Sequence, residues 1–163
     1  MLSRTASSFL RRSATRCMST EAATAVKLNF CLPQETLYKG ASVHSVILPG
    51  MGGEYGITAN HVPYVSQLKP GVVKILHEEG SADPEKYFVA GGYALTHPDS
   101  TTDVICPEAV KLDDIDPSEV AKKYDAARTK FSSATAGSIE QAEAQIEMEI
   151  TKEMGMAIGV SLN

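Results

Sequence analysis

Acidic residues are missing from the start of the chain, because none precedes Glu21. The first twenty residues instead contain four arginines, with serine and threonine between them and a few apolar residues that would gather on the opposite side of a helix. Arg11 and Arg12 interrupt the only candidate for the apolar core of a secretory signal. The composition therefore predicts a mitochondrial transit peptide over residues 1–20, cleaved within residues 17–20; a frayed polar terminus is the alternative.

Positive charge is scarce in the rest of the chain. Of the 15 Lys and Arg residues, four lie in the first twenty positions, which leaves 11 against 20 Asp and Glu, a net charge of about −9. Such a surface repels a phosphate backbone, so nucleic acid is not an expected partner. No apolar run approaches the ~20 residues of a membrane span, and we expect any contact with a membrane to be made through another protein.

Cysteine pairs and metal-binding patterns are also lacking. The three cysteines, Cys17, Cys31 and Cys106, form no CxxC pair and show no zinc spacing, and the four histidines are scattered. Cys31 and Cys106 lie in apolar, strand-like segments and are expected to be buried thiols. We therefore predict that the chain holds no metal and no cofactor.

Short alternating apolar segments fill the first part of the chain after the leader. Turn signals separate them about every eight to twelve residues, which is typical of an antiparallel β-sandwich rather than of βαβ units. The pattern predicts strands at residues 26–32, 41–48, 72–76, 86–90, 93–97 and 102–106, with a tight bend at Gly91-Gly92. This all-β N-terminal sandwich is expected to occupy residues 24–112.

An α-helical hairpin is expected to follow in residues 113–156. Asp116 with Pro117, and Ser138 with Gln141, are signals for the starts of two helices, and Gly155 is a signal for a stop. Helical spacing puts the apolar residues of each helix on one narrow stripe, by which the helices should pack. The expected packing residues are Val120, Tyr124, Ala127, Phe131, Ile139, Ala142, Ile146 and Ile150. Because both stripes are narrow, the hairpin should gain from a docking partner.

Glycine and proline are concentrated between residues 48 and 71. A phosphate-binding loop places such glycines between a strand and a helix, but Pro63 and the β-branched residues around it oppose a helix. We therefore expect a tight loop here. His61 with Glu54 nearby is a conceivable acid–base pair, which keeps a hydrolase open, although a loop histidine that is exposed or bonded to the backbone is the simpler interpretation.

Four strings, in this order, carry a resemblance to a known family. They are Gly53-Glu54-Tyr55-Gly56-Ile57, His61-Val62-Pro63, Leu68-Lys69-Pro70-Gly71 and Phe88-Val89-Ala90-Gly91-Gly92. Over roughly residues 26–154 the chain resembles the small central-stalk subunits of the rotary, proton-translocating ATP synthases, called delta in mitochondria and epsilon in bacteria and chloroplasts. The resemblance implies a β-sandwich followed by a helical hairpin, with no catalytic residues and no cofactor of its own.

The resemblance also implies partners and a location. In the family the sandwich lies at the foot of the stalk, between the gamma subunit and the ring of c subunits, and in mitochondria a further small subunit, epsilon, holds the hairpin. It implies a c-ring-facing loop made of Gly53, Glu54, Tyr55, His61 and Pro63, with Glu54 offering its carboxylate to basic residues. The expected place is the matrix side of the mitochondrial inner membrane, with membrane contact only through the c ring.

Two alternatives remain open beside a non-catalytic stalk subunit. Some bacterial members of the family bind ATP through an Ile/Leu-Asp-x-x-Arg-Ala signature at the start of the hairpin, so a nucleotide-sensing stalk subunit is the first. Here Glu119 stands where the signature has arginine, and no arginine follows Arg128, so a triphosphate would meet carboxylates. The second and more distant alternative is a β-sandwich hydrolase of the mitochondrial matrix.

Overall fold

The computed structural model describes residues 23–80 and 83–162, so the expected transit peptide and Cys17 lie outside the described residues. The strands are β1 (Val26–Cys31), β2 (Thr36–Val43), β3 (Ser45–Gly50), β4 (Gly53–Thr58), β5 (Tyr64–Leu68), β6 (Gly71–Leu76), β7 (Glu85–Val89), β8 (Gly92–Thr96), β9 (Thr101–Ile105) and β10 (Ala109–Lys111). A short 3₁₀ turn, η1 (Leu112–Asp114), leads to the helices α1 (Pro117–Ser133) and α2 (Ile139–Ala157).

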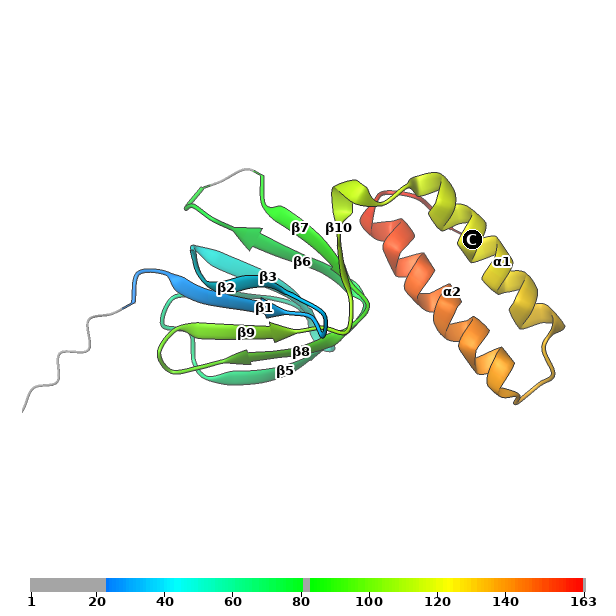
Figure 1. Cartoon of the computed structure of the whole chain (residues 1–163), viewed down its shortest axis with the longest axis horizontal. Helices are drawn as coiled ribbons and strands as arrows, with labels where there is room; N and C mark the ends of the chain where they lie inside the picture. The colour runs from blue at the N-terminus through cyan, green and yellow to red at the C-terminus, as the bar shows by residue number, and fades with distance from the viewer. Residues whose placement is uncertain (1–22, 81–82, 163) are drawn as a thin grey trace, which may run out of the picture.

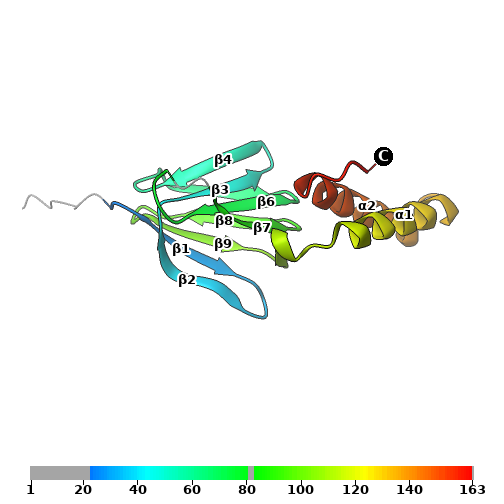
Figure 2. The same cartoon turned by 90° about the horizontal axis from the view of Figure 1, so that it is seen from above.

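The strands follow the order β10-β7-β6-β3-β5-β8-β9-β1-β2, and β4 pairs with β3 beside this path. Neighbours are antiparallel except for β1 and β9. The sheet folds over on itself around one apolar core (Figures 1 and 2). Alternate residues of the strands supply that core, as period-two burial requires. Its fully buried members include Leu28, Phe30, Leu48, Ile57, Ile75 and Val104. The prediction of an N-terminal β-sandwich followed by a helical hairpin is confirmed.

Two predictions within the sandwich are wrong. Residues 41–48 do not form one strand, because the chain turns at His44, whose backbone N–H donates to the carbonyl of Leu76, and β2 and β3 lie on either side. The segment 48–71 is not a single loop either, since it contains β4 and β5. Glycine lowers strand propensity but does not exclude an edge strand, and Gly53, with φ of 126°, supplies the positive backbone angle of the tight β3–β4 turn.

The bend at Gly91-Gly92 is sterically specific. Gly92 has φ of 145°, and a Cβ placed there would lie 2.3 Å from the carbonyl oxygen of Ile105. Any side chain larger than hydrogen would therefore clash with the backbone of β9, and only glycine allows β8 to begin this close to β9.

The two helices begin where their cap signals predict. The N–H of Ser118 donates to Asp116 Oδ1 at 2.8 Å, and the N–H of Gln141 donates to Ser138 Oγ at 3.2 Å. Helix α2 does not end at Gly155 but continues to Ala157, and Gly159, with φ of 79°, follows its end. The helices lie beyond one end of the sandwich, where α2 contacts β6 and η1 contacts β7 (Figure 1).

Candidate interaction surfaces

Glu54 lies on β4, just after the β3–β4 turn, and not in a long loop. Both of its carboxylate oxygens accept hydrogen bonds from Lys74 Nζ of β6, at 3.1 Å each. Lys74 pairs with Ile47, and Ile47 pairs with Gly56, two residues after Glu54, so the lysine reaches Glu54 diagonally across β3. A basic residue of a partner would therefore compete with Lys74 for this carboxylate.

Tyr55, the neighbour of Glu54, points the other way. Its ring packs on the core and meets Tyr64 edge to face, with the centroids 5.6 Å apart. A Cβ on Gly50 would come within 2.9 Å of the Tyr55 ring, so Gly50 makes the space for it. Burial raises the pKa of the Tyr55 hydroxyl. The position supports the strand from inside rather than presenting a side chain for contact.

His61 and Pro63 follow the far end of β4, in the loop that leads to β5. The six residues of β4 span about 17 Å, so this loop and Glu54 lie at opposite ends of the strand. His61 Nδ1 lies 2.8 Å from the carbonyl oxygen of Val62. The structure thus does not bring His61 and Glu54 together, and the acid–base pair that a hydrolase would need is not formed by these two residues.

The β4–β5 loop is nevertheless well fixed. Asn60 takes a left-handed conformation with φ of 59°, which asparagine tolerates better than most residues. Its backbone N–H donates to Ser100 Oγ and its side-chain amide donates to the carbonyl of Ala23, both at 2.8 Å. These bonds join the β4–β5 loop to the β8–β9 loop and to the first described residues.

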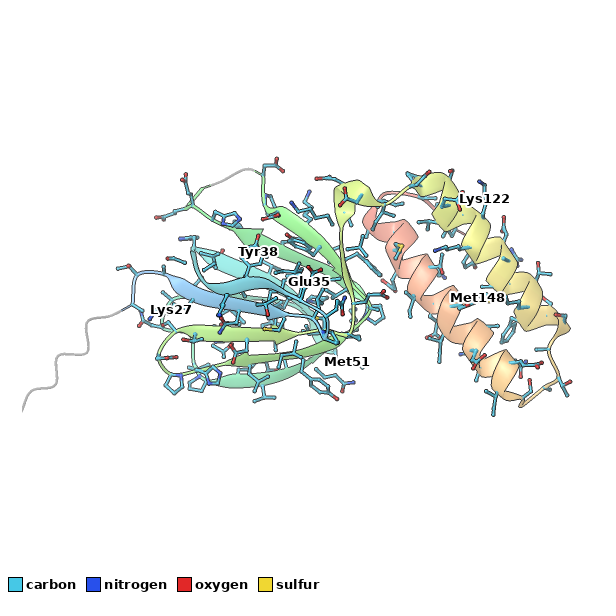
Figure 3. The ribbon with its side chains drawn as sticks, in the orientation of Figure 1. Lys27, Glu35, Tyr38, Met51, Lys122 and Met148 are labelled. Atoms are coloured by element: carbon cyan, nitrogen blue, oxygen red, sulfur yellow. The ribbon has the colours of Figure 1, made fainter. Side chains whose placement is uncertain are left out.

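Met51, in the β3–β4 turn, lies at the end of the sandwich nearest the helices, whereas Lys27 lies toward the other end (Figure 3). Strand β4 connects the two ends, and among the described strands it pairs only with β3, so its other edge is open. The expected contact loop is therefore an edge strand with a turn at each end.

Within the hairpin, the residues expected to pack are mostly buried on α1 but mostly exposed on α2. Val120, Tyr124 and Ala127 of α1 are buried, and Phe131 is half-buried. On α2 the expectation needs correction, because Ile139 is 79% exposed, Ile146 is 56% exposed and Ala142 is exposed, while Ile150 is half-buried.

Small residues, not isoleucines, form the buried face of α2. Its buried residues are Ala144 and Gly155. Ala144 lies two residues from both Ala142 and Ile146, which is a rotation of about 200° around the helix, so the two sets of residues occupy opposite sides. A side chain as small as that of Ala144 lets two helices approach closely. Gly155 is buried in another way, under the segment that follows α2, since a Cβ there would come within 2.7 Å of Leu162 Cδ1.

A groove of about 640 Å³ opens on one side of the hairpin. It is bordered by the link before α1 and by both helices. Its apolar lining is Val110, Ile115, Val120, Ala126, Ile150 and Met154, and its charged lining is Asp114, Asp116, Glu119, Glu147, Lys123 and Lys130. Lys130 Nζ and Glu147 Oε2 form an ion pair at 3.0 Å across the hairpin. Four carboxylates against two lysines leave the groove negatively charged.

A polar cluster around Glu85 closes the sandwich. Its carboxylate accepts hydrogen bonds from Tyr38 and from Tyr87, and it lies 2.7 Å from Lys111 Nζ and 3.2 Å from His77 Nε2. Tyr38 belongs to β2, at one end of the strand order, whereas Tyr87 and Lys111 belong to β7 and β10 at the other. The cluster therefore joins the two ends of the folded sheet.

The charges of this cluster follow from its hydrogen bonds. Burial alone raises the pKa of Glu85, but hydrogen bonds from Lys111, Tyr38 and the other donors outweigh it and lower the pKa to about 2. Burial, together with the hydrogen bond to Glu85, raises the pKa of Tyr38 far above its usual value. Sequence patterns did not predict this cluster, because Tyr38 lies 47 positions from Glu85, Lys111 lies beyond it on β10, and no local motif connects them.

The outer face of β5, β8 and β9 carries exposed apolar side chains. Val65, Tyr93 and Ile105 are each at least half exposed. Tyr93 pairs with Ile105 on β9 and with Gln67 on β5. Val65 lies two residues before Gln67, so it is on the same face of the sheet, diagonal to Tyr93. Exposed apolar side chains that adjoin one another are characteristic of surfaces that contact other proteins.

Other kinds of site find little support in the described part of the chain. Within residues 23–80 and 83–162 no three His, Cys, Asp or Glu side chains are grouped to hold a metal ion. Of the helices in the same residues, neither is long and apolar enough to cross a membrane. Cys106 is buried, and its burial raises the pKa of the thiol to about 12, so it is a poor nucleophile.

Three features of the surface are typical of a protein that binds other proteins. They are the open edge strand with its ion pair, the exposed apolar face of the sandwich, and the partly exposed apolar residues of the helical hairpin. Comparison with known proteins gives the family. The sequence pattern of the beta-sandwich domain of the ATP synthase delta/epsilon chain matches residues 25–111. The chain therefore belongs to the ATP synthase delta/epsilon chain family, which confirms the resemblance seen in the four sequence strings.

Individual relatives agree with this assignment. The chain is 43% identical over 145 residues to the mitochondrial ATP synthase subunit delta of Eremothecium gossypii, covering 89% of each chain. It is 41% identical over 133 residues to that of Saccharomyces cerevisiae, covering 82% of this chain and 80% of the relative. Among solved structures, a chain in the Euglena gracilis mitochondrial ATP synthase matches with a TM-score of 0.77 at 26% identity, over 86% of this chain and 85% of that one.

Proposed function

We propose that this chain is a non-catalytic subunit of the central stalk of the mitochondrial ATP synthase, and that it couples rotation of the c ring to the gamma subunit during ATP synthesis. The observation that carries the proposal is the 43% identity to a mitochondrial delta subunit over 89% of the chain. The chain would act in the mitochondrion, on the matrix side of the inner membrane, and would meet the membrane only through the c ring.

Stiffness is the physical property that this role requires. A subunit that transmits torque must not deform between the surfaces that receive and deliver it. A close-packed β core has low compressibility. Here the core is closed by the Glu85 cluster and the β4–β5 loop is tied down through Asn60. Both features support a rigid adaptor.

For the c ring we propose the open edge of β4, with Glu54 near one end and His61 and Pro63 beyond the other. The Glu54 carboxylate is 54% exposed, so a basic group of a partner can reach it and compete with Lys74 for it. Tyr55 and Gly53 would serve this surface indirectly, by anchoring the strand and shaping its turn.

For the gamma subunit we propose the outer face of β5, β8 and β9. A permanent interface is more apolar at its centre than ordinary protein surface, and Val65, Tyr93 and Ile105 provide such a centre. The small epsilon subunit of the mitochondrial enzyme would hold the hairpin, which has few contacts of its own with the sandwich.

Native electrophoresis of solubilised mitochondria tests the proposal. The tagged chain should migrate with the assembled ATP synthase, and its removal should lower proton-driven ATP synthesis. A chain that migrates on its own while the synthase is intact would refute the proposed function. The same gel separates the stalk subunit from the matrix hydrolase, which would stay free of the complex.

A further inference from the structure

Two residues with strained backbone conformations are in contact with each other. Within residues 23–80 and 83–162, Asn60 and Ser100 are the two non-glycine residues whose φ is positive, at 59° and 64°. They lie 40 positions apart, in the β4–β5 and β8–β9 loops, yet the backbone N–H of Asn60 donates to Ser100 Oγ at 2.8 Å. A left-handed conformation is unfavourable for a residue with a side chain, so it persists only where the surroundings fix it, and such residues cluster at functional sites.

Ser100 uses all of its polar groups to join three segments. Its carbonyl accepts a hydrogen bond from the N–H of Lys27 on β1 at 2.9 Å, and its own N–H donates to the carbonyl of His97 at 3.2 Å. Its hydroxyl holds Asn60, and only 3% of the residue is exposed. Lys27 marks the end of the sandwich away from the helices (Figure 3). At that end, Ser100 therefore fastens the β4–β5 loop, the β8–β9 loop and β1 together.

The far end of β4 depends on this contact. Among the described strands β4 pairs only with β3, so no strand pairing ties its far end to β5 or to β8. The N–H of His61 donates to the carbonyl of Thr58, which shapes the loop but does not fasten it to another strand. The bond from Asn60 to Ser100 does fasten it, and the side-chain amide of Asn60 adds a tie to Ala23. Without these bonds, a force on the loop would bend it about the end of β4.

We propose that Ser100 is a positioning residue for coupling: through Asn60 it fixes the β4–β5 loop, so that force on the open edge of β4 passes into β8 and β9. The inference rests on the proposed function, in which His61 and Pro63, just after Asn60, lie on the c-ring side and the outer face of β5, β8 and β9 meets gamma. His97 follows β8 and Ser100 precedes β9, so the contact adjoins two strands of that second face.

Amide hydrogen exchange in the purified chain tests the contact itself. Ser100→Ala removes the acceptor of the Asn60 N–H, so residues 58–63 should exchange about fivefold faster than in the wild type. Ser138→Ala is the matched control, because it also removes a serine oxygen that accepts a backbone N–H, that of Gln141 at the start of α2. It should leave exchange in residues 58–63 unchanged. Unchanged exchange there in Ser100→Ala would overturn the proposal.

Mitochondria that carry variant chains test the role in coupling. Ser100→Gly also removes the hydroxyl, but glycine adopts the left-handed conformation freely, so this variant should fold and should unfold at nearly the wild-type temperature. ATP synthesis at a fixed proton-motive force, per assembled complex, should nevertheless fall about threefold or more in both Ser100 variants. ATP hydrolysis by the catalytic part, once released from the membrane, should stay unchanged. Ser138→Ala should alter neither rate.

The possible outcomes separate this inference from the proposed function. Wild-type synthesis with Ser100→Gly present in the complex would overturn the positioning role alone. Loss of Ser100→Gly from the complex would overturn it too, because Ser100 would then serve assembly and not coupling. A wild-type chain that is absent from the synthase refutes the proposed function instead.

Discussion

Lys111 Nζ lies 2.7 Å from Glu85 Oε1, and this ion pair joins the last residue of β10 to the first residue of β7. Immediately after Lys111 the chain leaves the sheet and enters η1, so the pair fixes the point from which the helices extend. Because Tyr38 binds the same carboxylate from β2, one side chain both closes the sandwich and anchors the root of the hairpin.

Replacing Glu85 by Gln should therefore lower the free energy of unfolding by about 1–2 kcal/mol at pH 7. The pKa of Glu85 is lowered from 4.5 to about 2, so its ionised form is favoured in the folded state. Stability from such a group is present above pH 4.5 and is lost as the pH falls toward 2. Urea unfolding at a series of pH values should show the difference between wild type and variant shrinking over that range.

Lys86→Gln is the control for this series, because Lys86 is exposed on the same strand and is not part of the Glu85 cluster. Its stability should follow that of the wild type at every pH. A difference between wild type and Glu85→Gln that stays constant down to pH 2 would show that the carboxylate acts through packing and not through its charge.

Glu54→Lys should impair coupling without unfolding the sandwich. The Glu54–Lys74 pair is largely exposed, so its loss should cost less than about 1 kcal/mol of stability. Proton-driven ATP synthesis in mitochondria that carry the variant should fall clearly, because a basic partner would now meet a lysine. Unchanged synthesis in a variant that is assembled into the complex would contradict the assignment of the β4 edge to the c ring.

The double variant Glu54→Lys/Lys74→Glu provides the sharper control. It restores an ion pair within the chain but moves the carboxylate from β4 to β6. Stability should return to that of the wild type, whereas ATP synthesis should not. If synthesis recovered with stability, the role of Glu54 would be confined to holding β4 in place.

Gly92→Ala should destabilise the sandwich by about 3 kcal/mol or more, because the new Cβ would overlap the carbonyl oxygen of Ile105 and the residue would have to keep a positive φ. Gly56→Ala is the matched change, since Gly56 is also in a strand but has open space around its Cα. It should alter stability by no more than about 0.5 kcal/mol. Thermal unfolding of the two variants measures the contrast, and similar losses in both would contradict the steric argument.

Local signals in the sequence were sufficient for the helix starts and for about half of the strands, namely β1, β6, β7, β8 and β9. Asp116 and Ser138 act within one turn of their own helices, and the alternation in β1 is visible in six consecutive residues. The β4 strand was missed because its three strand-opposing features, Gly53, Gly56 and the nearby Pro63, are tolerated at a sheet edge, where only tertiary pairing with β3 defines the strand.

The face of α2 that packs on α1 could not be predicted from the sequence, for a different reason. The isoleucine stripe is the most apolar side of the helix, and periodicity alone cannot tell whether such a stripe faces the same chain or another one. The buried residues of α2 are instead Ala144, whose small side chain permits close helix packing, and Gly155, which lies under Leu162 of the segment after the helix. The same limit applies to the Glu85 cluster, because residues as far apart as Tyr38 and Lys111 meet only once the sheet has closed.

ATP should not bind to the hairpin in the physiological range. The groove where a nucleotide would lie is bordered by Asp114, Asp116, Glu119 and Glu147, and one of its two lysines, Lys130, is already paired with Glu147. Four carboxylates repel a triphosphate, and among the described residues no arginine lines the groove to bind it in a bidentate way. Calorimetric titration of the purified chain should give no saturable heat below about 1 mM ATP, which corresponds to a binding free energy weaker than about −4 kcal/mol.

Weak heats that disappear when salt is raised would be non-specific, and inorganic triphosphate should reproduce them. A saturable isotherm with a Kd in the micromolar range would instead establish the nucleotide-sensing alternative, and would require the acidic border of the groove to rearrange around the ligand.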